Sequence, residues 1–293
     1  MQILNEFNHT DWNASFSNEA RSQAIETLEN GSIVHFPSLP FLLAPHEDQF
    51  LSKNLSNIKS KNISFNMTSD LLRGVECTPE QSQQLKSMMK RFSQYAANLI
   101  RELFPTYTCA LEIGRTSFRP VEISGRATSY RKDDTRLHVD AFPATPNQGR
   151  RILRVFTNIN PDGKERLWRV GEPFSDVAYR FLPLVSKQWY GKAALLKTLK
   201  ITKSYRTEYD HIMLKIHNNM KADMIYQKKS PQTEIGFLPG TTWVVQTDHV
   251  PHAAMSGQHL LEQTFYLPVT AMQNPTLSPL RILETLTGRT LVK

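Results

Sequence analysis

The sequence predicts a mainly β protein with flanking helices (α+β), in which a jelly-roll core is supported by N-terminal helices and interrupted by a helical insertion. Short β-favouring runs separated by Gly, Pro, Asp and Asn fill residues 107–161, and strand-like runs return after residue 235. Residues between these two regions have helical spacing instead. Because the strands do not alternate regularly with helices, an antiparallel jelly roll fits better than a parallel sheet.

Composition is that of a folded globular protein. The chain has 293 residues, of which 40% are hydrophobic and 21% charged, far from the composition of a disordered chain. We expect one domain over residues 1–293. Its helical N-terminal support covers about residues 1–106, the β core about 107–170 and 235–272, and the helical insertion about 171–234.

The N-terminal sequence, the cysteines and the net charge indicate the compartment of the protein and the kinds of partner to expect. The N-terminus lacks the basic end and apolar run of a signal peptide, and Cys77 and Cys109 have no paired spacing, so we expect a cytoplasmic protein without disulfides or a zinc ribbon. A formal net charge of +8 favours anionic partners. The basic residues are not interleaved with aromatics in a reader motif, so nucleic acid is not expected. The sequence does not predict an oligomeric state.

The first expected elements are a helix and a strand. Ser17 or Asn18 can cap a helix through residues 20–30, and Gly31 can end it before the strand-like residues 32–38. The polar stretch after them is expected to be irregular surface structure over residues 46–76.

A long amphipathic helix is expected next. Thr78, Pro79 and Glu80 combine a capping side chain, a first-turn proline and an early acid. Apolar residues then recur at three-and-four spacing until Pro105, which predicts a helix packed against the protein.

Strands and insertion helices follow from the same patterns. The expected strands before the insertion are residues 108–118, 123–130, 136–142 and 150–159. The expected insertion helices are residues 179–185, 193–200 and 205–221. The expected strands after the insertion are residues 236–247, 252–255 and 258–269.

An HxD pattern within residues 136–142 suggests a metal site. On a β-strand His138 and Asp140 project to one face while Val139 faces the other. An imidazole and a carboxylate bind first-row divalent metals, and a second histidine would complete the facial triad of non-haem Fe(II) oxygenases. Alone, His138 and Asp140 are weak evidence for a metal site, because a His and an Asp that are hydrogen-bonded at the protein surface are commoner.

Two downstream histidines compete to be the third ligand. His249 and His252 are three apart and point in opposed directions in an extended chain, so one ligand is expected. We favour His252, which enters an apolar run. His249 lies beside Asp248 in a polar turn, so we expect it to be exposed to solvent, with support of a ligand as its alternative role.

Longer blocks around these residues resemble a known family. RLHVDAFPATPNQGRRILRVFTNINP, HNNMKADMIYQ and TDHVPHAAMSGQHLLEQTFYLPV are similar to the 3-deoxy-D-manno-oct-2-ulosonic acid (Kdo) hydroxylases of Gram-negative bacteria. These belong to the Fe(II)/2-oxoglutarate-dependent dioxygenases, whose cupin-like core is a double-stranded β-helix. The resemblance implies Fe(II) held by His138, Asp140 and His252, with 2-oxoglutarate as cosubstrate and O2 as oxidant.

Such an enzyme needs a cation for the free carboxylate of 2-oxoglutarate. Many members place a basic residue about ten positions after the second histidine, but this chain has Glu262 in that region. Arg154 is therefore the preferred anchor, since it lies between apolar strand residues and can bind a carboxylate through two hydrogen bonds. Thr135 and Tyr130 are further candidates for that carboxylate, or ordinary strand residues.

The family substrate implies the partners. The resemblance implies hydroxylation at carbon 3 of a Kdo residue on lipid A, giving Ko with succinate and CO2, and peripheral contact with the anionic inner membrane surface on the cytoplasmic side. Candidate contacts for the anionic substrate, which a solvated charge run would explain almost as well, are Arg119, Arg126, Arg131 and Lys132. A polar cluster in the insertion is expected to fix it by hydrogen bonds, or else to contact substrate: His217, Asn218, Lys221 and Asp223.

Two other functions stay open from the sequence. A jelly-roll metalloenzyme that does not use 2-oxoglutarate, such as a cupin-like isomerase or dioxygenase, would keep the three metal ligands without needing Arg154. A non-catalytic carbohydrate-binding or membrane-binding module would use His138 and Asp140 structurally and bind through its basic surface.

Overall fold

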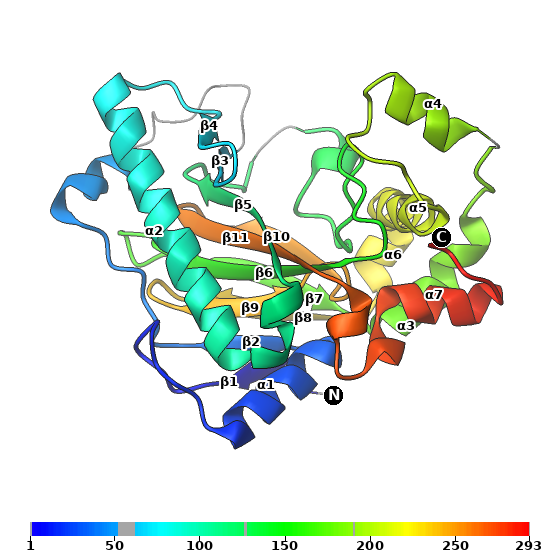
Figure 1. The fold of residues 1–293 in the computed structure, drawn as a ribbon, viewed down its shortest axis with the longest axis horizontal. Coiled ribbons are helices and arrows are strands. Elements are labelled where there is room, and N and C mark those ends of the chain that lie inside the picture. The colour runs from blue at the N-terminus through cyan, green and yellow to red at the C-terminus, as the bar shows by residue number, and fades with distance from the viewer. Residues whose placement is uncertain (1, 52–61, 126–127, 190, 293) are drawn as a thin grey trace.

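The computed structural model describes residues 2–51, 62–125, 128–189 and 191–292. Figure 1 shows two sheets at the centre, with helices from the N-terminal part over one face and the insertion helices beside them. In the described residues no helix combines the length and the apolar character needed to cross a membrane. The helices are α1 (Asn18–Glu29), α2 (Pro79–Leu103), α3 (Phe174–Phe181), α4 (Lys192–Thr198), α5 (Glu208–Ala222), α6 (Met224–Lys229) and α7 (Pro279–Thr287).

The strands form a sheet of eight and a sheet of three. The large sheet has the order β1-β2-β9-β6-β11-β5-β3-β4 and the small sheet the order β10-β7-β8. Every neighbouring pair is antiparallel except β1 with β2. The strands are β1 (Leu4–Glu6), β2 (Ile33–Phe36), β3 (Ile63–Asn66), β4 (Leu71–Arg73), β5 (Glu112–Arg119), β6 (Arg151–Asn158), β7 (Arg166–Gly171), β8 (Gln232–Phe237), β9 (Thr242–Gln246), β10 (His252–Ser256) and β11 (Leu260–Leu267).

An aromatic core joins the two sheets. Phe156 of β6 and Trp243 of β9 meet Trp168 of β7 and Phe237 of β8, and the rings of Phe237 and Trp243 stack with centroids 3.9 Å apart. Offset and edge-on ring pairs add to the free energy gained by burying their area. Successive side chains of β6 point to opposite faces of the large sheet. Val155 packs under the helices, whereas Phe156 faces the small sheet. The sheets are therefore held at a fixed separation.

The N-terminal helices cover the outer face of the large sheet. Ser17 caps α1 and Thr78 caps α2, as the sequence predicts, and Gln81 completes a capping box with Thr78. The apolar stripe of α2 is buried on β5 and β11. The described parts of 46–76, residues 46–51 and 62–76, are less irregular than expected, since they contain β3 and β4, which extend the large sheet beyond β5.

The helices α3, α4, α5 and α6 occupy the region where an insertion is expected, between β7 and β8. Several expectations differ from the structure. The strand expected over residues 236–247 is two strands, since β8 ends at Phe237 in the small sheet and β9 begins at Thr242 in the large one. β8 begins at Gln232, because its pairing with β7 extends to Gly171. The described residues of 123–130 contain no strand, so that prediction was wrong, and a single turn of 3-10 helix begins at Tyr130.

A fully buried ion pair ties β6 to the loop after β9. Nε of Arg151 lies 2.7 Å from Oδ2 of Asp248, and Oδ1 of Asp248 accepts the backbone N–H of Ile152 at 3.1 Å. Both side chains are 0% exposed. Removing one partner of such a pair leaves an uncompensated charge in the core, which is strongly destabilising.

We expect Asp248→Ala to lower the free energy of unfolding by about 3–5 kcal/mol, because Arg151 would stay buried without its partner. Urea denaturation measures the loss. Arg289→Ala is the matched control, since the Arg289–Glu208 pair is half exposed and should contribute less than about 1 kcal/mol. Equal losses in the two variants would show that the buried pair has no special role.

Candidate active site

The HxD segment lies against the first residue of β10. The backbone N–H of His138 donates to the carbonyl of His252 at 3.0 Å, and the N–H of His252 donates to the carbonyl of His138 at 2.8 Å. The N–H of Asp140 donates to Thr247 at 2.8 Å. The segment is thus extended and paired, although the pairing is an isolated bridge rather than the longer strand expected for residues 136–142.

Three predicted ligands converge at this bridge. One donor atom from each of His138, Asp140 and His252 lies within 4.8 Å of the others, and all three residues are buried. They are the one metal-ligand cluster of this kind among the described residues. Two imidazoles and a carboxylate on one side of a prospective ion form the donor set of a facial triad, with positions left for other ligands.

Each imidazole is oriented by the backbone two residues before it. Nδ1 of His138 lies 2.7 Å from the carbonyl oxygen of Arg136, and Nδ1 of His252 lies 2.8 Å from that of Val250. A carbonyl only accepts, so each Nδ1 carries the proton and each Nε2 keeps its lone pair. Burial lowers the pKa of both rings, which keeps them neutral and available to a metal. The residues present therefore fit a divalent cation.

Asp140 is held as a carboxylate. Burial alone would raise its pKa, but the charge of Arg154, with Nη2 at 3.1 Å, outweighs burial and holds the pKa well below its usual range. Asp140 is therefore ionised at neutral pH and available to ligate a cation.

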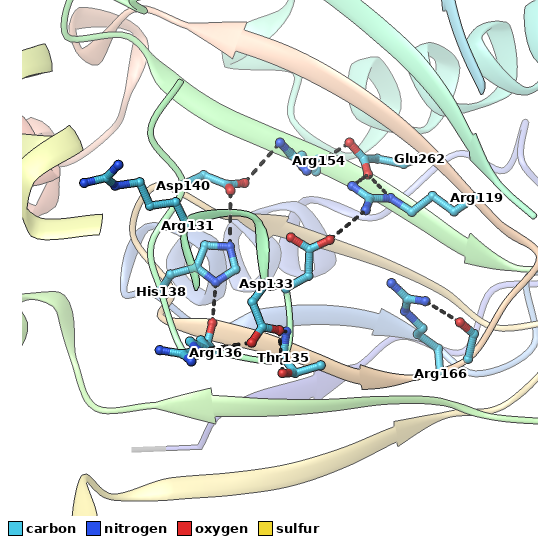
Figure 2. A network of polar contacts seen from close by, with 12 residues as sticks. Arg119, Arg131, Asp133, Thr135, Arg136, His138, Asp140, Arg154, Arg166 and Glu262 are labelled. Carbon is cyan, nitrogen blue, oxygen red and sulfur yellow. Dashed lines mark hydrogen bonds and ion pairs between the residues drawn. The ribbon is translucent and has the colours of Figure 1, made fainter. Parts of the chain in front are cut away.

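A chain of charged groups continues from Asp140 (Figure 2). Nη1 of Arg154 lies 2.9 Å from Glu262, and Glu262 in turn accepts from Arg119 at 2.6 and 2.9 Å. Arg154 thus bridges the predicted metal ligand Asp140 to Glu262. Arg154 and Glu262 are 7% and 3% exposed.

These groups border a cavity of about 300 Å³ between the sheets. Residues two apart on a strand line it together, as on β6, β7 and β10. The lining residues are Asn62, Arg119, Lys132, Asp134, His138, Asp140, Phe142, Arg154, Phe156, Arg166, Trp168, His252 and Ala254.

Arg166 differs from the other two arginines of the cavity. Its Nη1 donates to the carbonyl of Gly257 at 2.8 Å, but its buried Nε has no hydrogen-bond partner, and among the described residues it forms no ion pair. Burial, helped by the charge of Arg119, lowers its pKa to about 9. Arg166 is therefore a charged guanidinium at neutral pH with capacity to bind an anion.

The other predicted ligand contacts divide into two groups. Arg119 and Lys132 line the cavity, whereas Arg131, Thr135 and Tyr130 do not. The hydroxyl of Thr135 donates to Asp133 at 2.6 Å, and the guanidinium of Arg131 lies over the ring of Tyr130. The structure does not bring these three side chains to the cavity, and Arg126 lies outside the described residues.

His249 is buried, which corrects the expectation of a solvent-exposed turn. It is 7% exposed and its ring packs edge-on against Phe174. The reason is its neighbour Asp248, whose pairing with Arg151 draws the turn into the core. His249 is not a member of the ligand cluster.

Hydrogen bonds join the insertion to the HxD segment, as the sequence predicts. Nδ1 of His217 lies 2.7 Å from the carbonyl of Val139, and Asp223 caps α6. The amide of Gln227 contacts both polar groups of the Leu137 backbone, at 2.7 and 3.0 Å. The α5 and α6 helices thereby fix the residues on either side of His138.

Sequence reasoning missed several residues of the site. Arg166, Trp168 and Asp134 line the cavity, and Glu262 balances two of its arginines. One signal was present for the first two, since a period of two within RLWRV places Arg166 and Trp168 on one face of a strand.

The chain is similar to several solved structures. Solved structures of the Kdo hydroxylase KdoO, a non-heme Fe(II) alpha-ketoglutarate dependent dioxygenase, are similar to this chain over nearly its whole length. The cobalt(II) complex has 50% identity and a TM-score of 0.97, with 100% of this chain and 98% of that chain covered. The complex with alpha-ketoglutarate and Fe(III) has 50% identity and a TM-score of 0.96, with 99% and 98% covered. The complex with succinate and Fe(III) has 49% identity and a TM-score of 0.96, with 100% and 98% covered.

No curated protein matches the chain. The family model described as 3-deoxy-D-manno-oct-2-ulosonic acid (Kdo) hydroxylase matches residues 11–290, which is almost all of the sequence. The chain therefore belongs to the Kdo hydroxylase family.

Proposed function

We propose that this protein is an Fe(II)/2-oxoglutarate-dependent dioxygenase that hydroxylates carbon 3 of a Kdo residue on lipid A, giving Ko. The observation that carries the proposal is the convergence of His138, Asp140 and His252 at the wall of a cavity lined by arginines. Iron bound there would make it possible for O2 to oxidise a carbon–hydrogen bond of the substrate, coupled to conversion of 2-oxoglutarate to succinate and CO2.

The residues of the chain hold and shield the reactants. His138, Asp140 and His252 present three donors from one side, so the cosubstrate and oxygen bind from the cavity. Phe142, Phe156 and Trp168 make much of the wall apolar. Exclusion of water there strengthens each ionic contact between the cavity and its ligands.

The arginines provide the anchor for the cosubstrate. Arg154 is the anchor that the sequence predicts, but its two Nη atoms already contact Asp140 and Glu262. Arg166 has no such partner and faces the same cavity. We therefore assign the free carboxylate of 2-oxoglutarate to Arg166, with Arg154 and Arg119 completing the positive wall. A jelly-roll enzyme without this cosubstrate would not need a buried guanidinium that lacks an ion pair.

The positive charge in the outer part of the cavity fits the proposed substrate. Kdo carries a carboxylate and lipid A carries phosphates, and Arg119 and Lys132 offer positive charge beside the metal site. We place the reaction at the cytoplasmic face of the inner membrane, where a lipid-linked sugar is available to a peripheral protein.

We also infer a double-stranded β-helix core. Its support is the path of the chain between the sheets: β5 and β6 belong to the large sheet, β7 and β8 to the small one, β9 to the large, β10 to the small and β11 to the large. The HxD segment, between β5 and β6, pairs with β10 of the small sheet.

We expect the purified protein with Fe(II), 2-oxoglutarate and O2 to add the mass of one oxygen atom to the inner-core sugar of Kdo-containing lipid A. Mass spectrometry of the lipid and assay of succinate measure both products, which should form in equal amounts. Succinate formation without the added oxygen would show that lipid-linked Kdo is not the substrate.

We expect Asp140→Ala to lower Fe(II) affinity by roughly a hundredfold or more, because removing groups that merely support a ligand already costs ten- to hundredfold. Iron retained after gel filtration is the measurement. Asp162→Ala is the matched control, since Asp162 is an exposed carboxylate in the turn after β6. Full iron retention in Asp140→Ala would contradict the assignment of the ligands.

We expect Arg166→Leu to weaken 2-oxoglutarate binding by at least roughly tenfold while iron stays bound, because the free carboxylate would lose its charged partner. Anaerobic titration of the visible charge-transfer band of the iron–cosubstrate complex measures the affinity. Arg115→Leu, at an exposed position of β5, should behave as the unaltered protein. An unchanged affinity in Arg166→Leu would exclude Arg166 as the anchor.

A further inference from the structure

Exposed apolar side chains gather on the insertion. Of the thirteen large apolar side chains that are exposed in the described part of the chain, seven lie between Tyr179 and Tyr205. The most concentrated group surrounds α4, where Trp189, Leu199 and Ile201 are 60%, 58% and 55% exposed. Single exposed apolar residues are ordinary in soluble proteins, but a group of this kind marks a surface that contacts a partner.

The same segment carries positive charge without negative charge. Residues 177–207 contain seven basic residues and no Asp or Glu. We define the docking surface as the exposed side chains in and around α4 that combine the two properties: Leu184, Lys187, Trp189, Leu195, Lys197, Leu199, Lys200, Ile201 and Lys203.

This combination suits one class of partner. Trp and Leu beside Lys, with no acidic residue between them, is the composition of segments that lie in the interface of an anionic bilayer. The apolar side chains enter the headgroup region while lysines attract the negative surface, and tryptophan is favoured at that depth.

The docking surface is connected to the active site through the chain that leaves the metal ligand Asp140. The backbone N–H of Lys203 donates to the carbonyl of Ala144 at 3.0 Å, and the amide of Gln148 donates to the carbonyl of Tyr205 at 3.2 Å. Phe142, which lines the cavity, lies two residues before Ala144. Figure 1 shows α4 at the outer end of the insertion, away from both sheets.

We propose that the docking surface holds the protein on an anionic phospholipid bilayer, with α4 lying in the plane of the membrane. The surface is separate from the cavity and acts without substrate. Its role in catalysis, which rests on the proposed function, is to bring the cavity to lipid-linked Kdo.

Trp189 provides a direct measurement of docking. The three other tryptophans, Trp12, Trp168 and Trp243, are at most 5% exposed, so Trp189 is the residue whose emission reports a change of surroundings. Vesicles of equal parts phosphatidylglycerol and phosphatidylcholine should shift the emission to shorter wavelength. Vesicles of phosphatidylcholine alone should not, and Trp189→Phe should abolish the shift. No shift with the anionic vesicles overturns the proposal.

Co-sedimentation with the same vesicles measures affinity. We expect Lys197→Ala and Lys200→Ala to weaken binding roughly fivefold each, and high salt to release the protein. The control removes the same kinds of group elsewhere: Leu42→Ser with Lys90→Ala, both at exposed positions far from α4. Binding that is unchanged in the lysine variants, or lost equally in the control, overturns the proposal. So does a change of oligomeric state without vesicle binding, which would make the surface a contact between copies.

An activity assay separates this proposal from the proposed function. With Kdo–lipid A embedded in anionic vesicles, Lys197→Ala/Lys200→Ala should be slower than the unaltered protein, whereas a water-soluble Kdo glycoside should be turned over equally by both. Equal rates on the embedded lipid overturn the catalytic role of docking. If neither protein oxidises either sugar but both bind vesicles as expected, the proposed function fails and the docking surface stands.

Discussion

The site depends on the backbone pairing between His138 and His252. These residues are far apart in the sequence, yet each donates its N–H to the other's carbonyl oxygen. That pairing is available because the chain passes repeatedly between two sheets, so that a segment after β5 meets the start of β10. Gly171 allows the close approach, since a Cβ there would come within 2.8 Å of the Leu137 side chain. Glutamine and histidine side chains of α5 and α6 then satisfy the neighbouring backbone groups, and this framework sets the positions of His138, Asp140 and His252.

Charge balance governs the cavity next to that pairing. Asp140 and Glu262 are buried carboxylates, and both are stabilised as anions by guanidinium groups that lie against them. Arg154 touches both carboxylates, so the electrostatics of the metal ligand and of the inner wall are coupled through one side chain. An acid at position 262 needs arginines from other strands, and Arg119 and Arg154 provide them from β5 and β6.

Local patterns predicted the elements whose signals lie close together in the sequence. The caps at Ser17 and Thr78, the long stripe of α2, β6 and the helical character of the insertion all follow from spacing within one segment. His138, Asp140 and His252 are predicted as ligands from the HxD spacing, from the apolar run that begins at His252 and from the family blocks around them. Long-range effects were not visible: β3 and β4 gain their stability by extending a sheet, and His249 is buried because Asp248 pairs with a residue ninety-seven positions away. Arg166 and Glu262 acquire their roles from partners on other strands, which no single segment reveals.

The carbonyl groups that accept from the two imidazoles lie only two residues before each ring, at Arg136 and Val250. The backbone just before each histidine therefore fixes the orientation of its ring before any ion binds. Most of the rotational freedom of the ligands is lost as the polypeptide folds. A cation bound by His138 and His252 would therefore meet a prepared pair of nitrogens, and its association and departure should leave the surrounding architecture unaltered.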